Sequence, residues 1–291
     1  MTDSVTVSIG MPVFNMEDHV GEAIESLLEQ SYSNFELIVS DNASTDSTLE
    51  IVDGYAHRDP RIRVLRQQVN MGAFPNFDVT VNEARGEWFM WAAGDDVWSR
   101  DWLQDLVASV AERNVAAFGT IQVVGATGDP ISHPANERSF DFSGGRIRRR
   151  LKYFMEPGIL GKANPIYGLF PTKLMRRIPL GCVSAIQFGA DMVYLYDLLA
   201  HVEILSVDGP ILKKRVLESG GGQVMQKRSS SKIRRLCRRI QNLFRGTLVL
   251  PCMKRSNLPE ALLILCATPV LFVCNIYSLI QYKLLQRRPI R

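Results

Sequence analysis

Two adjacent carboxylates, Asp95 and Asp96, are the residues of this sequence with the clearest capacity for chemistry. They follow the uncharged run 88–94, which is rich in tryptophan and favours a strand covered on both faces. Open α/β sheets bind ligands beyond the carboxyl ends of their strands. Neighbouring carboxylates there can hold Mg²⁺ or Mn²⁺, and the metal can hold a diphosphate. A turn after Gly94 is the structural alternative, because Asp is favoured in turns.

Polar side chains also follow two other predicted strands. They are Asn15 and Glu17 after strand 6–14, and Asp41, Asn42 and Ser44 after strand 35–40. In a parallel sheet these strand ends share one edge, so residues distant in the chain can line one pocket. Each cluster taken alone is also consistent with helix caps and turns.

Strands and helices alternate along the first 113 residues, and this order predicts a doubly wound, mostly parallel α/β sheet. Further strands are predicted at 61–66 and 88–94, with helices after residue 17, after Ser47, over 72–85 and after Ser99. Ser47 and Glu50 have the spacing of a capping box, and Ser99 is the expected N-cap of the helix that follows the carboxylate pair.

Charge is unevenly distributed along the 291 residues. Residues 222–291 contain 14 Lys and Arg against the single acid Glu260, whereas the whole chain has a net charge of +4. Residues 1–221, here called the body, therefore have a net negative charge. This split argues against nucleic acid as a partner of the body. The five cysteines form no Cys-x-x-Cys pair, and residues 1–5 do not begin a secretory signal. We therefore expect a cytoplasmic protein without a disulfide framework or a zinc site.

Four ordered segments, 12–17, 38–48, 70–72 and 84–87, precede the carboxylate pair and together resemble the family 2 glycosyltransferases of the GT-A fold. The resemblance extends more weakly through 166–170 and 189–192 to 213–215. It implies an inverting enzyme that moves a sugar from a nucleoside diphosphate sugar to an acceptor hydroxyl. Neither the dinucleotide fingerprint nor the phosphate-binding loop is present, so the nucleotide must be held in another way.

The resemblance also implies roles for individual residues. Pro12 and Phe14 would flank the base and ribose, Asp41 would hydrogen-bond the base, and Asp95 would reach the ribose or diphosphate. Asp96 would bind the divalent metal, Mg²⁺ or Mn²⁺. The remaining donor-site residues are Val13, Asn15, Glu17, Asn42 and Asn70. Ala93 stands where many members carry a further Asp, so phosphate and water would complete the metal site, which suits Mg²⁺.

Asp191 is the candidate general base of the acceptor half. It opens a predicted helix, where an Asp can also serve simply as a cap. The resemblance places the base here, and one carboxylate opposite the leaving diphosphate suffices for an inverting transfer. The basic run 146–150 begins another predicted helix, and it is interpreted either as a solvated helix face or as a phosphate site.

We expect a catalytic domain over residues 1–221, with a nucleotide-sugar half at 1–113 and an acceptor half at 114–221. Residues 222–291 form a basic, helical tail. Its apolar and basic positions over 233–245 predict a helix that lies on an anionic membrane or packs on the body. The uncharged run between Glu260 and Lys283 is consistent with an interfacial or re-entrant helix, a buried helix or a full span. The tail therefore points to an anionic membrane surface, through 223–291, on the cytoplasmic face.

The leading functional interpretation is a glycosyltransferase of surface glycan or polysaccharide synthesis that acts on a saccharide or lipid-linked acceptor. The alternative is a nucleotide-sugar-binding or scaffold protein of the same fold with impaired catalysis, because of Ala93. The donor sugar, the acceptor and the linkage depend on loops and follow from no pattern in the sequence.

Overall fold

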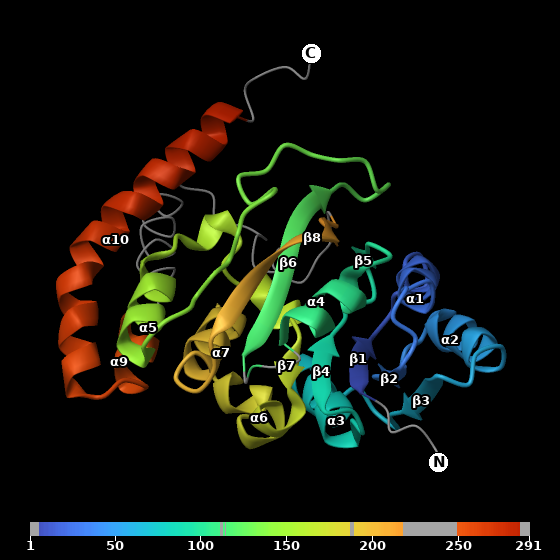
Figure 1. Ribbon diagram of the computed structural model, residues 1–291. Coiled ribbons are helices and arrows are strands. Elements are labelled where there is room, and N and C mark those ends of the chain that lie inside the picture. Colours follow the sequence, from blue (N-terminus) through green and yellow to red (C-terminus); the bar gives the residue numbers. More distant parts are fainter. Residues whose placement is uncertain (1–5, 111–112, 114, 187–188, 218–248, 286–291) are drawn as a thin grey trace.

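The computed structural model describes residues 6–110, 113, 115–186, 189–217 and 249–285. Its main sheet has five strands in the order β3-β2-β1-β4-β7 (Figure 1). These strands are β1 (Val7–Val13), β2 (Phe35–Asp41), β3 (Ile62–Arg66), β4 (Trp88–Trp91) and β7 (Phe170–Pro171). The first four are parallel, and β7 runs antiparallel to β4. The predicted α/β class with a mostly parallel sheet is confirmed.

Along the chain, the helices of the first half alternate with the strands, as the sequence pattern predicts. They are α1 (Val20–Leu28), α2 (Thr48–Ala56), α3 (Ala73–Glu83) and α4 (Trp102–Val110). Val13 pairs with Asp41 across β1 and β2, and Gly10 pairs with Trp91 across β1 and β4. The carboxyl ends of these strands therefore lie side by side, and their polar clusters share one edge of the sheet.

A second sheet of three strands, in the order β5-β8-β6, packs beside the first. Its strands are β5 (Val97–Trp98), β6 (Ala116–Val124) and β8 (Ile204–Arg215). Val97 pairs with Lys213, so the end of β8 lies next to the carboxylate pair. The main sheet takes β7 from the second half of the chain and the second sheet takes β5 from the first half. The two predicted halves thus interlock.

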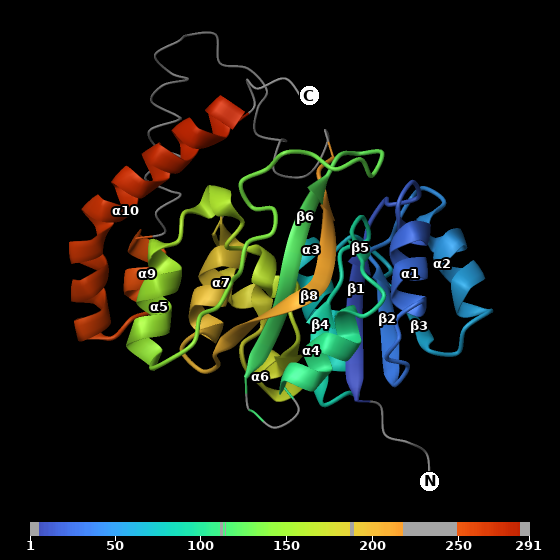
Figure 2. The ribbon, with the colours of Figure 1, turned by 45° about the horizontal axis from the view of Figure 1, so that its top comes forward.

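The remaining helices surround the second half of the chain. They are α5 (Arg146–Met155), α6 (Thr172–Arg177), α7 (Ala190–Leu198), α9 (Val249–Lys254) and α10 (Leu258–Leu285), with 3₁₀ helices η1 (Gly158–Leu160), η2 (Asn164–Tyr167) and η3 (Leu180–Val183). Figure 2 shows α5, α9 and α10 together at one end of the molecule, with α1 and α2 at the opposite end.

The described part of the predicted tail, from residue 249 on, packs on the rest of the protein. Cys252 of α9 and Ile264 of α10 are 1% and 2% exposed and belong to the hydrophobic core. The predicted amphipathic helix over 233–245 lies outside the described residues. Within the part of the chain that the structure describes, no helix is both long and apolar enough to cross a membrane.

Two predicted N-caps are wrong in their chemistry. Ser47 occupies the N-cap position of α2 but makes no capping bond with its side chain, and Asp46 Oδ1 accepts the Thr48 N–H instead, at 3.0 Å. Ser99 caps no helix, because it directly follows β5 and α4 begins only at Trp102. Its hydroxyl accepts the Ile211 N–H at 2.9 Å and so ties this segment to β8.

The basic run at the start of α5 is not uniformly solvated. Arg149 and Arg150 are 9% and 1% exposed, whereas Arg146 and Arg148 face solvent. The interpretation of the whole run as a solvated helix face is therefore wrong for its last two residues. A buried arginine needs a partner, because its charge cannot be neutralised by deprotonation.

Candidate active site

The loops after β1 and β2 are joined by side chains that the sequence assigns to the donor site. Asn15 has a positive φ of 51° and accepts the Thr45 N–H on Oδ1 at 2.9 Å, while its own N–H donates to Ser44 Oγ at 3.0 Å. Glu17 Oε2 accepts the Ser47 N–H at 2.9 Å. The polar capacity of Asn15 and Glu17 is thus used to hold the two loops together.

Asn42 and Asn70 have a similar role on the other side of β2. The Asn42 side chain donates to Asn70 Oδ1 at 3.0 Å and accepts the Met71 N–H at 2.9 Å. Asn42 is 3% exposed, and Pro12 and Val13 are likewise buried within β1. Asn42, Pro12 and Val13 therefore have little surface left for a ligand, whereas Asn70 is exposed.

Asp41 and Phe14 keep free binding capacity at this edge. Asp41 is 2% exposed, and its Oδ2 accepts the Ser44 N–H at 3.2 Å. Its Oδ1 is buried and has no hydrogen-bond partner in the described part of the chain. A buried acceptor without a partner is costly, so a ligand N–H or O–H there would be favourable. Phe14 is 38% exposed, which leaves an aromatic ring available for a planar group.

Asp96 is paired within the protein. It is fully buried, its Oδ2 accepts from Lys214 Nζ at 2.6 Å, and its Oδ1 accepts the Arg215 N–H at 2.9 Å. Burial lowers the pKa of Lys214, but the charge of Asp96 outweighs this effect and the pKa is raised. The 2.6 Å contact between Lys214 Nζ and Asp96 Oδ2 is that of an ion pair. This arrangement disagrees with the predicted role of Asp96 as the direct metal ligand, since neither oxygen is open to solvent.

Asp95 is the member of the pair that faces outward. It is partly exposed, and no hydrogen bond of its carboxylate is recorded within the described residues. Its backbone is fixed, because Arg215 Nε donates to the Asp95 carbonyl at 2.9 Å and Arg215 Nη1 to the Ala126 carbonyl at 2.7 Å. Nowhere in the described ranges do three or more His, Cys, Asp or Glu gather as a metal site. A cation at Asp95 would need phosphate and water as its other ligands, which Mg²⁺ accepts.

Asp191 lies in the first turn of α7. The N-cap position belongs to Gly189, whose φ of 73° suits glycine, and Asp191 Oδ1 accepts the Met192 N–H at 2.8 Å. Burial raises the pKa of Asp191, although this hydrogen bond and the charge of Lys214 act against the increase. A carboxylate with a raised pKa is a stronger proton acceptor than an ordinary Asp.

Lys214 links the predicted donor and acceptor residues, and the sequence analysis assigned it no role. Its Nζ lies 4.4 Å from the centroid of the Tyr167 ring. The charges of Asp95, Asp96, Asp191 and Lys214 all act on the Tyr167 hydroxyl, so these groups form one electrostatic cluster. In the sequence, the feature that could have indicated Lys214 is the basic triplet 213–215. In the structure, this triplet ends β8, and the exposure of its side chains falls from Lys213 to Arg215.

A mostly parallel α/β sheet with these groups at its carboxyl edge is the arrangement of the GT-A fold. The same fold occurs in S. aureus TarS 1–349 in complex with UDP-GlcNAc, with a TM-score of 0.57 and 19% identity over 89% of this chain and 69% of that chain. The sequence pattern of the family described as glycosyl transferase family 2 matches residues 8–178. The chain belongs to this family.

Curated relatives agree with this family. EpsE of Bacillus subtilis (strain 168), which is named as a glycosyltransferase, is 35% identical over 167 residues, or 57% of this chain and 55% of EpsE. The Escherichia coli UDP-Glc:alpha-D-GlcNAc-diphosphoundecaprenol beta-1,3-glucosyltransferase WfgD is 29% identical over 123 residues, or 42% of this chain and 48% of WfgD. The matches thus cover about half of the length of these relatives.

The Asp96–Lys214 pair generates a stability prediction. Replacing Lys214 by Met leaves a buried carboxylate without its cation, which costs about 3–5 kcal/mol of unfolding free energy at pH 7. The unpaired Asp96 has a folded-state pKa above its unfolded value, so the folded protein binds the extra proton and the deficit shrinks as the pH falls. Urea unfolding at pH 7 and pH 5 measures this. Lys213→Met is the matched control, because Lys213 is an exposed neighbour. Equal loss in both variants would contradict the prediction.

Proposed function

We propose that this protein is an inverting glycosyltransferase of cell-surface polysaccharide synthesis. The observation that carries the proposal is that the charges of Asp95, Asp96, Lys214 and Asp191 all act on the Tyr167 hydroxyl, while Lys214 Nζ lies 2.6 Å from Asp96 Oδ2 and 4.4 Å from the centroid of the Tyr167 ring. In the proposed site, Asp95 would face the donor and Asp191 the acceptor, with the charge of Lys214 between them. This is the arrangement that an in-line sugar transfer needs, with a leaving diphosphate on one side and a proton acceptor on the other.

The proposed donor is a uridine diphosphate sugar. The TarS 1–349 structures include complexes with UDP and with UDP-GlcNAc, and WfgD is named for UDP-Glc. In this chain, the unpartnered Oδ1 of Asp41 would accept an N–H of the base, and the exposed ring of Phe14 would pack against the base. The hydrogen bonds of Asn15 and Asn42 would keep both groups in place by holding the surrounding loops.

Asp95, rather than Asp96, is the proposed metal ligand. A bound Mg²⁺ or Mn²⁺ would offset negative charge on the leaving diphosphate. Asp96 would act indirectly, because it fixes Lys214, whose charge is then available beside the diphosphate. The two carboxylates of the motif thereby have separate roles, one toward the ligand and one toward the protein.

Asp191 is the proposed general base. It would take the proton of the acceptor hydroxyl while that oxygen forms its bond to the anomeric carbon and the bond to the nucleoside diphosphate breaks. Attack opposite the leaving group inverts the anomeric centre. A saccharide or a lipid-linked saccharide is the proposed acceptor, by analogy with the diphosphoundecaprenol acceptor in the name of WfgD.

The metal assignment is tested with Asp95→Asn beside wild type. We expect the variant to lose metal-dependent binding of the UDP sugar and to lower transfer by about 10²-fold or more, because the only outward carboxylate of the pair is gone. Isothermal titration with and without Mn²⁺ measures the binding. Metal-stimulated binding as strong as that of wild type would place the cation elsewhere. Lys213→Met, at an exposed position of β8, is the control.

The base assignment is tested with Asp191→Asn, which keeps the size of the side chain and an oxygen for the Met192 N–H. We expect an unchanged melting temperature and donor affinity, with transfer lowered by about 10²- to 10⁴-fold. In wild type the rate should fall as the pH drops through the raised pKa of Asp191, since the protonated acid accepts no proton. Transfer rate, donor affinity and melting temperature are measured on the same samples.

Near-normal transfer by Asp191→Asn would remove Asp191 from the mechanism. A wild-type protein that binds UDP sugars with metal but neither transfers nor hydrolyses them would instead support the second candidate, a nucleotide-sugar-binding protein. The observation that favours this candidate is Ala93, two residues before Asp95, because many members of the family carry an Asp at that position.

We also propose that α5 and α10 form a surface for anionic lipid. Both views place the two helices side by side (Figures 1 and 2). Leu258, Leu262 and Leu265 of α10 are 74%, 54% and 55% exposed, while Arg148 and Lys152 of α5 face solvent. Glu260, the only acid of α9 and α10, is buried. Exposed apolar and cationic side chains without free acids fit the interface of an anionic membrane.

The lipid surface is tested with the double variant Arg148→Glu/Lys152→Glu. Each basic side chain near an anionic surface contributes about 1 kcal/mol, so binding to phosphatidylglycerol-containing vesicles should weaken by at least about tenfold. Co-sedimentation with anionic and neutral vesicles measures this. Lys173→Glu/Arg177→Glu on α6 makes the same charge change at exposed positions elsewhere and is the control. If both double variants lose vesicle binding equally, the binding depends on the net charge of the protein and not on a surface formed by α5 and α10.

A further inference from the structure

Helix α7, which carries Asp191 in its first turn, is held at its other end by two arginines of α5. Arg149 Nε donates to the Leu199 carbonyl at 2.6 Å, and Arg150 Nε donates to the Tyr196 carbonyl at 3.2 Å. The last carbonyls of a helix lack partners within the helix and carry its negative dipole end, so they bind cations well. The Arg150 guanidinium also lies 3.9 Å from the centroid of the Tyr196 ring.

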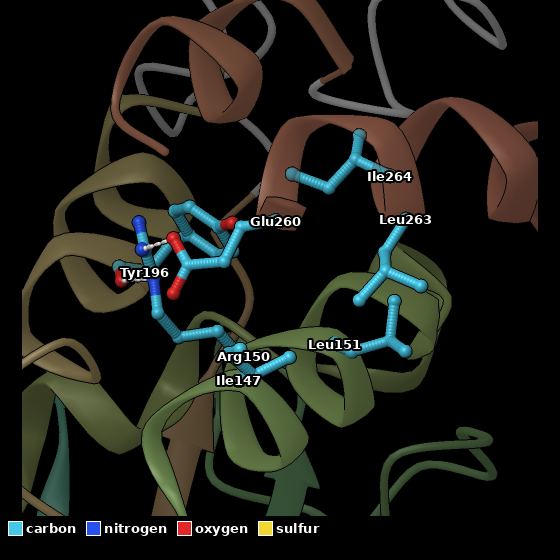
Figure 3. A pocket seen from close by; sticks show the side chains of 7 residues that line it. All are labelled: Ile147, Arg150, Leu151, Tyr196, Glu260, Leu263 and Ile264. Carbon is cyan, nitrogen blue, oxygen red and sulfur yellow. Dashed lines mark hydrogen bonds and ion pairs between the residues drawn. The ribbon is translucent and has the colours of Figure 1, made fainter. Parts of the chain in front are cut away.

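The charge of Arg150 is balanced by Glu260, which lies 110 residues further along the chain. Their side chains are 1% and 3% exposed, and Arg150 Nη1 donates to Glu260 Oε2. Arg146, which is 46% exposed, reaches the other oxygen of the same carboxylate at 3.0 Å. Figure 3 shows Arg150 and Glu260 meeting between α5 and α10, beside a small pocket.

The carboxylate of Glu260 is held in place by the start of its own helix. Glu260 N donates to Asn257 Oδ1 at 3.0 Å, and Asn257 N donates back to Glu260 Oε2 at 3.4 Å. This reciprocal pattern is a capping box, which fixes the first turn of α10. The side chain that neutralises Arg150 is therefore rigid, and so is its distance from α5.

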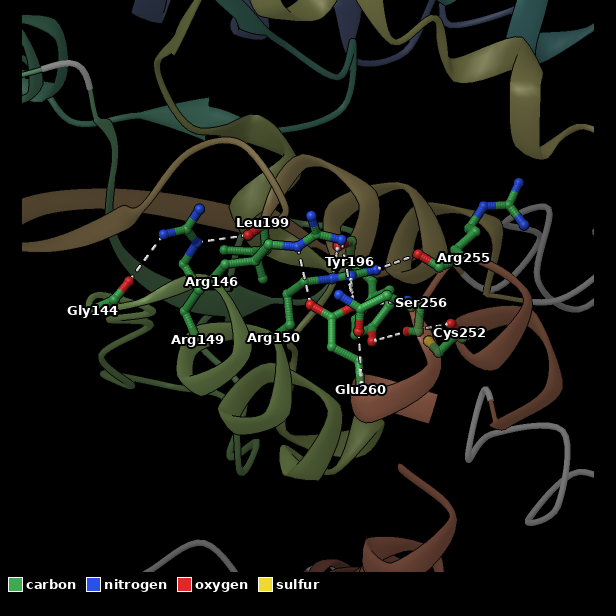
Figure 4. A network of polar contacts seen from close by, with 11 residues as sticks. Gly144, Arg146, Arg149, Arg150, Tyr196, Leu199, Cys252, Arg255, Ser256 and Glu260 are labelled. Atoms are coloured by element: carbon green, nitrogen blue, oxygen red, sulfur yellow. Dashed lines mark hydrogen bonds and ion pairs between the residues drawn. The ribbon is translucent and has the colours of Figure 1, made fainter. Parts of the chain in front are cut away.

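The linker between α9 and α10 adds direct contacts to α7 (Figure 4). Arg255 Nε donates to Asp197 Oδ2 at 2.5 Å. The Tyr196 hydroxyl bonds Ser256 Oγ at 2.7 Å. Arg150 Nη2 donates to the Arg255 carbonyl at 2.9 Å, which closes the network. The C-terminal half of α7 is thus bound both by α5 and by the linker between α9 and α10.

Helix α5 also contacts the first turn of α7. Tyr153 of α5 is fully buried and donates its hydroxyl proton to the Met192 carbonyl at 3.0 Å, directly beside Asp191. Tyr153 and Arg150 are three residues apart on α5 and so lie on one helix face. A shift of α5 relative to α7 would therefore change the hydrogen bonds at both ends of α7, including those of the turn that carries Asp191.

We propose that Arg150 and Glu260 are positioning residues for sugar transfer. Their buried ion pair fixes α7 between α5 and the α9–α10 linker and thereby holds the first turn of α7, which carries Asp191, in place. Residues 249–264 are then a working part of the acceptor half, although their place in the sequence is beyond the expected catalytic domain. The proposal rests on the proposed role of Asp191 as the base.

The test is Glu260→Gln, which keeps the size of the side chain and removes its charge. We expect kcat to fall by about ten- to a hundredfold, because small displacements of a catalytic group have effects of that order. KM and affinity for the UDP sugar should stay within about twofold, since the donor edge is formed by β1, β2 and β4. The acid limb of the pH profile of kcat should also move, because the surroundings of Asp191 change. Arg146→Gln, which removes the exposed arm of the same carboxylate, should leave kcat unchanged.

A second variant separates positioning from folding. Replacing a buried ion pair by apolar side chains of similar volume is often neutral for stability. Arg150→Met/Glu260→Met should therefore melt at a higher temperature than Glu260→Gln, yet keep the low kcat because the bonds to the Tyr196 and Arg255 carbonyls are lost. A folded Glu260→Gln protein, or a folded double variant, with the kcat of wild type would overturn the proposal.

Asp191→Asn in the same assay distinguishes the two levels of failure. If Asp191→Asn transfers normally, the base assignment fails and this inference fails with it. If Asp191→Asn is inactive while Glu260→Gln has the kcat and pH profile of wild type, only the inference fails.

Discussion

The buried ion pair between Asp96 and Lys214 is the interaction on which the site depends. A carboxylate without solvent access is tolerated only when it is paired and hydrogen-bonded, and Lys214 together with the Arg215 N–H meets that condition. The pair fastens the end of β8 to the turn between β4 and β5. Because of this contact, the two sheets meet where their strand ends carry polar groups, and Asp95 is left facing outward.

Few polar side chains remain free for a ligand at the carboxyl edge of the main sheet. Asn15, Glu17 and Asn42 use their hydrogen-bonding capacity to join three loops that follow different strands. Fixed loops are useful, because a binding site loses less entropy on binding when it is already ordered. The unpartnered Oδ1 of Asp41 and the exposed ring of Phe14 then stand out as the groups with binding capacity.

The acceptor side is organised by charge within the protein. Helix α5 brings two buried arginines against α7, and Glu260 of α10 supplies the compensating acid. The same two helices present cationic and apolar side chains to solvent, so a single helix pair has a structural inner face and a proposed lipid-binding outer face. The C-terminal segment is therefore connected with both the proposed base and the proposed membrane surface.

The sequence by itself determined the α/β class, the first four strands of the main sheet and the edge at which Asp41, Asp95 and their neighbours gather. Apolar runs and polar strand ends are local patterns, and the parallel sheet converts them into one edge. Only the tertiary structure decided which carboxylate of the pair is buried, because its partner Lys214 lies 118 residues away. The same reason explains the buried Arg149 and Arg150 and the missing cap at Ser99. Their partners come from β8, α7 and α10, and the pairing of distant charges and N–H groups leaves no local pattern.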